Sequence, residues 1–161
     1  NQTHIMLILL LYDGGLRVGE ACQIAWEHVD LSQKCIKVRG KGGGERLVQL
    51  PPLAIQALKS TPRSSTYVFG NHPLPTRTAY EWIRRAGAAA GLQKPLHPHA
   101  LRHSYATHLL SSGMNLRILQ KLLGHQSLQA TSRYTHLSID QLASTLESFH
   151  PLGNKSNKNI P

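Results

Sequence analysis

The stretch CIKVRGKGGGERLVQL, residues 35 to 50, decides the fold class of this chain. Residues 35–38 and 46–50 are short, β-branched and apolar runs, and the glycine-rich segment GKGGG lies between them. Two such runs around a glycine-rich turn predict an antiparallel β-hairpin. The chain is therefore not entirely helical.

The segments on both sides of the hairpin have the periodicity of helices. Before it, an apolar run from His4 is broken by Asp13-Gly14-Gly15, and a second helix is expected over residues 17–26. After it, a proline pair starts a helix through Leu58, and residues 67–69 suggest a further short strand. Later helices are expected over residues 76–90, 99–112, 116–123, 128–134 and 139–149. These elements predict a mostly α fold with a small antiparallel β-sheet, in the α+β class.

Composition favours a polyanionic partner. The 161 residues suit one domain, and 18 Lys and Arg against 8 acidic residues give a formal charge of +10. Double-stranded DNA is the first candidate, because neutralised phosphates release their counterions. No apolar run approaches the ~20 residues that span a bilayer, and no stretch of this sequence has the charged start, apolar middle and small-residue cleavage site of a secretory signal. Cys22 and Cys35 are too few for a disulfide framework, so we expect two buried thiols in a cytoplasmic protein.

The segment HPHALRHSYATHLL, residues 97 to 110, carries the first candidate site. His99 and Arg102 are three residues apart and share one helical face, beside an apolar stripe. The spacing of His99 and His103 also suits two zinc ligands. However, Ala100 stands where a metalloprotease helix has glutamate, and no third ligand is near. Each histidine alone is more often structural or solvated, and we keep that interpretation for His103 and His108.

Two further cations follow glycines or lie among them. Arg17 in GGLRVGE follows a glycine turn, and Lys41 in RGKGGGER lies at the expected hairpin tip. Either residue alone would be an ordinary surface cation. The glycines around Lys41 do not match a P-loop, because no Gly-Lys-Ser/Thr precedes a helix.

Taken together and in order, these stretches and LLGHQSLQATSRYTH, residues 122 to 136, resemble the catalytic domain of the tyrosine recombinase (phage integrase) family, most of all its Xer-type members. The resemblance covers nearly the whole chain. It implies a catalytic set consisting of Arg17, Lys41, His99, Arg102, His125 and the nucleophile Tyr134, with Glu20 as a supporting acid.

The implied chemistry suits these residue types. Tyr134 would attack a DNA phosphodiester and become joined to the 3' phosphate, while Arg17 and Arg102 hold the charged oxygens. His99 is a plausible general base for the phenol. Lys41 would protonate the leaving 5' oxygen, and His125 would donate a hydrogen bond to the phosphate. No metal or other cofactor is called for, since the arginines supply the charge.

The resemblance also implies partners and boundaries. We expect a catalytic domain over residues 1–151 and a polar tail over 152–161, with the family's N-terminal DNA-binding domain absent from this chain. Apolar residues at helical spacing after Leu137 suggest a C-terminal helix that docks on a neighbouring subunit in a homo- or hetero-tetramer.

Several departures from the Xer pattern leave the subfamily open, including Ser132 and Arg133 before the tyrosine. The alternatives are an integrase of a phage, plasmid or transposon, a hairpin telomere resolvase, or a DNA-binding module without catalysis.

Overall fold

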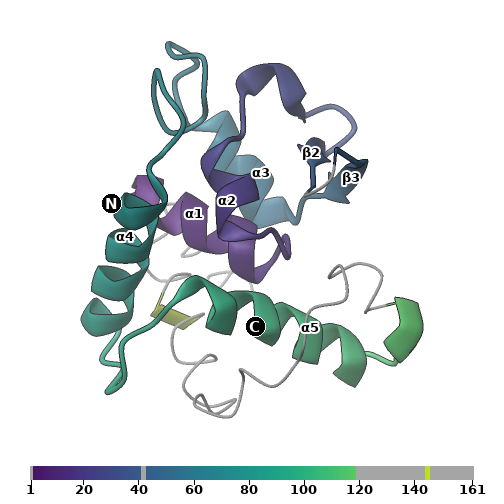
Figure 1. The fold of residues 1–161 in the computed structure, drawn as a ribbon, viewed down its shortest axis with the longest axis vertical. Helices are drawn as coiled ribbons and strands as arrows, with labels where there is room; N and C mark the ends of the chain where they lie inside the picture. The colour runs from purple at the N-terminus through teal and green to yellow at the C-terminus, as the bar shows by residue number, and fades with distance from the viewer. Residues whose placement is uncertain (1, 41–42, 119–143, 146–161) are drawn as a thin grey trace, which may run out of the picture.

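The computed structural model, which describes residues 2–40, 43–118 and 144–145, consists of packed helices with a small sheet at one side (Figure 1). The mostly α architecture with one antiparallel sheet confirms the predicted fold class. The helices are α1 (Gln2–Tyr12), α2 (Val18–Cys22), α3 (Pro52–Lys59), α4 (Thr76–Ala89) and α5 (Pro98–Ser111), with a 3-10 turn η1 (Trp26–His28). The strands are β1 (Val29–Asp30), β2 (Cys35–Arg39) and β3 (Glu45–Gln49).

Helix α1 forms the centre of the core. Its residues 5–11 are all buried, as is usual for a helix that is apolar all round. It packs against α2, α3, α4 and α5, and Figure 1 shows α5 crossing beneath α1 and α2. This packing brings the start of α5 next to the glycine turn that follows α1, although the two segments are far apart in the sequence.

The sheet has the order β1-β2-β3, with both pairs antiparallel. Side chains alternate between its two faces. Ile36 and Val38 of β2 are buried, whereas Lys37 and Arg39 are exposed. In the β2–β3 register Val38 lies opposite Arg46. Arg46 therefore belongs to the inward face of the hairpin.

The second helix ends at Cys22 and does not reach Trp26 as the sequence predicted. The backbone of residues 24–26 instead pairs with a distant loop. Val68 donates its N–H to the Ile24 carbonyl at 2.9 Å, and Trp26 donates to the Thr66 carbonyl at 3.1 Å. Residues 67–69 were expected to form a short strand. The structure instead has two isolated β-bridges there, from Tyr67 to Ala25 and from Tyr67 to Gly70.

The other expectations are met within the described residues, with one difference. The predicted helices after the hairpin correspond to α3, α4 and α5 within one or two residues at each end. Cys22 is buried, but Cys35 is only half-buried. The helix expected from Leu116 is described only to residue 118. The helix expected over residues 128–134, most of the one over 139–149, and the tail lie outside the described residues. None of the described helices is long and apolar enough to span a membrane.

Candidate active site

Four of the predicted site residues, Glu20 among them, line one pocket of about 480 Å³. Arg17, His99 and Arg102 contribute to it from the turn before α2 and from the first turns of α5. Gly40, the residue after β2, also lines it. The fold therefore brings Arg17 to the same pocket as His99 and Arg102, which the sequence places in a separate motif.

The glycine turn before α2 fits closely under α5. Gly15 has a φ of +68°, in the left-handed region that favours glycine. A Cβ atom at Gly15 would lie 2.3 Å from Cε1 of Tyr105. The Gly15 carbonyl accepts a hydrogen bond from Nε of Arg102 at 3.2 Å. The glycine turn thus positions both arginines. Arg17 follows it directly in the chain, and Arg102 is held by the Gly15 carbonyl.

Tyr105 belongs to the segment 97–110, for which the sequence predicted an apolar stripe but no role for this tyrosine. The structure places its ring against Gly15, within the framework of the site. A tyrosine three residues after Arg102 shares the face of that arginine on a helix. That spacing was the available signal, but the partner could not be identified without the fold.

Arg102 is unusually buried for an arginine, with 7% of its surface exposed. Burial, followed by the nearby charge of Arg17, lowers the pKa of Arg102 to about 10. It remains protonated at neutral pH, but both effects penalise its charge. An anion between the two guanidinium groups would relieve that penalty. The pocket is therefore suited electrostatically to a charged oxygen.

Glu20 supports the site from within α2. Its Oε1 accepts the backbone N–H of Arg17 at 2.8 Å. Its two oxygens accept hydrogen bonds from Nη1 and Nη2 of Arg46 at 2.5 and 2.9 Å. Burial opposes ionisation, but these hydrogen bonds and the charges of Arg46 and Arg17 together lower the pKa of Glu20. Glu20 is therefore a carboxylate already bound to protein groups.

The sequence interpretation missed Arg46. The signal was present in the alternation of the hairpin, because Arg46 is paired with Val38 on the inward face. A charged residue at an inward strand position generally has a buried partner. The hairpin register was needed to recognise it, and residues 41–42 in the turn lie outside the described part of the chain.

His99 is exposed at the pocket wall, close to other histidines of the same segment. Its ring centroid lies 6.1 Å from that of His97, whose Nδ1 accepts the N–H of Ala100 at 3.3 Å and caps α5. Burial and the charges of His99, Arg102 and His97 lower the pKa of His103. Within the described ranges, no group of three His, Cys, Asp or Glu side chains is arranged to hold a metal.

The remaining predicted residues, Lys41, His125 and Tyr134, lie outside the described residues. Their roles stay predictions. Gly40, the residue before Lys41, is described and lines the pocket.

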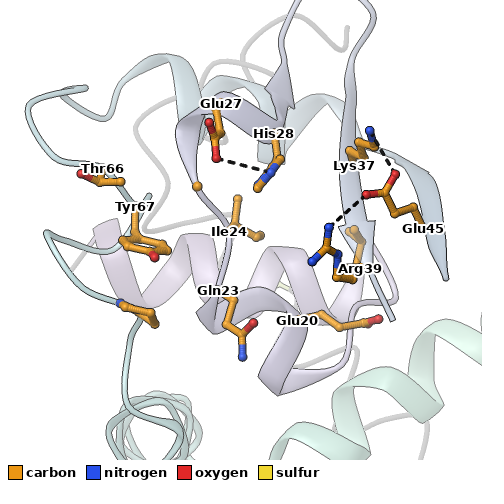
Figure 2. A pocket seen from close by; sticks show the side chains of 13 residues that line it. Glu20, Gln23, Ile24, Glu27, His28, Lys37, Arg39, Glu45, Thr66 and Tyr67 are labelled. Atoms are coloured by element: carbon orange, nitrogen blue, oxygen red, sulfur yellow. Dashed lines mark hydrogen bonds and ion pairs between the residues drawn. The ribbon is translucent and has the colours of Figure 1, made fainter. Parts of the chain in front are cut away.

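A second pocket, of about 400 Å³, lies beside the first and shares Glu20, Gln23 and Arg39 with it (Figure 2). Figure 2 shows Glu45 at its edge between Lys37 and Arg39. The Nζ of Lys37 lies 3.0 Å from Glu45 Oε2, and Nη2 of Arg39 lies 3.5 Å from Glu45 Oε1. These exposed ion pairs join the two strands of the hairpin to each other.

Two arginines and a histidine thus line one pocket, and the Glu20 carboxylate accepts the backbone N–H of Arg17. Their charge and hydrogen-bond donors suit an anion such as a phosphate. The chain belongs to the phage integrase family, whose model matches residues 2–140. It is 38% identical over 153 residues to a protein named tyrosine recombinase XerC from Xanthomonas campestris pv. campestris strain B100, covering 90% of this chain and 48% of that protein.

Solved structures have the same fold. The crystal structure of XerA recombinase matches with a TM-score of 0.66 and 31% identity, covering 93% of this chain and 63% of that one. The XerH site-specific recombinase bound to a palindromic difH substrate, in a post-cleavage complex, matches with a TM-score of 0.64 and 25% identity, covering 91% and 46%. This chain thus spans about half the length of the XerC and XerH proteins.

Proposed function

We propose that this chain is the catalytic domain, over residues 1–151, of a site-specific DNA recombinase that cleaves and rejoins strands through a tyrosine. The observation that carries the proposal is the shared pocket of Arg17, His99 and Arg102. The likeness to XerC and to XerH bound to its difH substrate supports DNA as the substrate. The net charge of +10 agrees with a polyanionic partner.

Cleavage would begin with attack of the Tyr134 oxygen on a phosphodiester. The new bond joins that oxygen to phosphorus, and the bond from phosphorus to the 5' oxygen breaks. Arg17 and Arg102 stabilise the negative charge on the nonbridging oxygens. Because a phenol with a pKa near 10 is a weak nucleophile at neutral pH, its proton must be removed. His99, exposed at the same pocket, is the proposed base.

The leaving 5' oxygen needs a proton, which Lys41 would supply from the hairpin tip. His125 would donate a hydrogen bond to the phosphate. The 3'-phosphotyrosyl bond retains the energy of the phosphodiester, so a 5' hydroxyl of a second duplex can reverse the step and form a Holliday junction. Dimer resolution of the Xer type, in the cytoplasm, is the task that we propose for this chemistry.

The experiment uses the full-length gene product and a nicked suicide substrate, from which the short fragment that carries the new 5' hydroxyl diffuses away after cleavage. The wild-type protein should give a covalent protein–DNA adduct on a denaturing gel. Tyr134→Phe removes only the nucleophilic oxygen, so it should give no adduct and bind DNA with nearly unchanged affinity. Full cleavage by the Phe variant would refute the assignment.

Assembly is a second part of the proposal. The apolar stripe after Leu137 would dock on a neighbouring subunit, in a homo- or hetero-tetramer that holds two recombination sites. Deleting residues from 137 onward should weaken paired-site complexes on a native gel but preserve binding of one subunit, because Arg17, His99 and Arg102 are retained. Unchanged pairing and recombination would show that the stripe serves no partner.

A further inference from the structure

Arg46 occupies an unusual place on the β2–β3 hairpin. Its neighbours in β3, Glu45 and Leu47, are exposed, whereas Arg46 lies on the inward face opposite buried Val38. Its guanidinium group makes two parallel hydrogen bonds to Glu20. Such a bidentate pair fixes both distance and orientation.

The partner of Arg46 belongs to a different element. Glu20 lies in α2, and its side chain is only 7% exposed, against 33% for Arg46. The same carboxylate binds the backbone N–H of Arg17. A continuous set of hydrogen bonds therefore runs from β3 through Glu20 to the residue that we place on the phosphate.

The end of β2 lies directly against this ion pair. A Cβ atom at Gly40 would be 3.7 Å from Nη1 of Arg46 and 3.9 Å from Oε2 of Glu20. The N–H of Gly40 also donates to the Gly44 carbonyl at 2.7 Å, which closes the base of the turn. Lys41 follows Gly40 by one peptide bond. The ion pair thus holds the hairpin at the point from which the chain continues to Lys41.

We propose that Arg46 is a positioning residue for the proton donor. Through Glu20 it joins the base of the hairpin to the turn that carries Arg17, so that Lys41 is presented to the same phosphate that Arg17 and Arg102 bind. This inference rests on the proposed function. A role in folding alone would not require the pair to connect these two parts of the site.

The test compares cleavage of two suicide substrates by the full-length protein, one with the natural 5' oxygen and one with a 5'-bridging sulfur. A thiolate leaves without a proton, so the sulfur substrate does not need a general acid. Arg46→Met keeps the length of the apolar stem but removes the guanidinium. Its cleavage of the oxygen substrate should fall by about 10-fold to 10²-fold, the effect expected of a small misplacement.

On the sulfur substrate, Arg46→Met should recover to near the wild-type rate, as Lys41→Ala should. Arg102→Lys should remain slow on both substrates. This variant has lost a contact with the phosphate, and a sulfur leaving group compensates only for a missing proton donor. Glu45→Gln is the matched control on the same hairpin, since it removes only the outward ion pairs. It should cleave both substrates at the wild-type rate.

Two results would overturn the inference. One is a wild-type rate of Arg46→Met on the oxygen substrate, and the other is an equal defect on both substrates. If Arg46→Met does not fold, Arg46→Lys serves, because a single ammonium cannot reproduce two parallel bonds. The cleavage rate of Arg46→Lys on the oxygen substrate should fall less, and it should likewise recover on the sulfur substrate. Absence of any adduct with the wild-type protein would instead refute the proposed function itself.

Discussion

The two faces of the β2–β3 hairpin carry ion pairs of different character. On the outward face, Glu45 pairs with Lys37 and Arg39, whose side chains are 53% and 76% exposed. On the inward face, Arg46 pairs with Glu20, a side chain that is only 7% exposed. Both carboxylates pair with positively charged side chains, but water screens the outward ion pairs much more than the inward one.

The faces differ also in what they connect. The outward pairs join adjacent strands that the backbone ladder already holds together. The inward pair joins β3 to α2 and, through the backbone N–H of Arg17, to the arginine pocket. Burial and the number of elements joined, and not the count of ion pairs, therefore identify the interactions on which the site depends.

The largest effect is expected inside the pocket. Arg102→Lys should slow cleavage on the order of 10²-fold or more, because a point charge cannot replace a planar clamp for the transition state. Single-turnover cleavage by the full-length protein measures it. A wild-type rate for this variant would show that Arg102 does not bind the phosphate. The inward face of the hairpin would then not be connected to a phosphate-binding pocket.

Gly15→Ala should produce the next largest effect. The new methyl group would overlap the Tyr105 ring, at a cost of about 1–3 kcal/mol for overpacking, in addition to about 1–2 kcal/mol for a left-handed alanine. The free energy of unfolding from urea titration measures the sum. Moving Gly15 should also disturb its carbonyl bond to Arg102 and slow cleavage.

Gly91→Ala is the matched control for Gly15→Ala. Gly91 also has a positive φ, +82°, but no atom lies within 4 Å of its added Cβ. This variant should show only the backbone cost and normal cleavage. Equal losses of stability in the two variants would mean that the contact between Gly15 and Tyr105 is not tight.

The Glu20 and Glu45 carboxylates should differ in how their contribution to stability changes with pH. The folded-state pKa of Glu20 lies below the ordinary value of 4.5, despite the opposing effect of burial. Its stabilisation is therefore complete above about pH 4.5 and disappears as the pH falls through the folded-state pKa. At neutral pH, Glu20→Gln should lower the free energy of unfolding by about 1.5–3 kcal/mol, the range for hydrogen bonds to charged groups.

Thermal and urea unfolding between pH 7 and pH 3 measure this difference. The gap between the wild-type protein and Glu20→Gln should close as the pH falls. Glu45→Gln, the smallest change, should leave the unfolding curve almost unchanged throughout, because solvent surrounds that side chain. A larger loss from Glu45→Gln than from Glu20→Gln would reverse the ranking of the two faces.

The sequence was sufficient for most of the fold because its signals are local. The apolar run of α1 and the alternating strands around a glycine turn predict their elements without help from the rest of the chain. The second helix was wrong beyond Cys22 because residues 24–26 pair with residues 66–68. No local pattern reports such a pairing.

The site was predictable to a similar extent. The order of the motifs indicated Arg17, His99 and Arg102, and the fold places them around one pocket. The order of the motifs did not indicate how deeply Arg102 is buried, the contact of Tyr105 with Gly15, or the partner of Glu20. Each of these depends on packing between elements that are distant in the sequence.

The proposed chemistry requires that one particular residue, Tyr134, becomes joined to DNA. The adduct from the suicide substrate would be digested with nuclease and trypsin and analysed by mass spectrometry. Trypsin cleaves after Arg133 and Lys155, and residues 134–155 contain a single tyrosine. We predict a nucleotide on Tyr134 through its 3' phosphate. A nucleotide on any other residue, or a link through a 5' phosphate, would show that Tyr134 does not form a 3'-phosphotyrosyl intermediate.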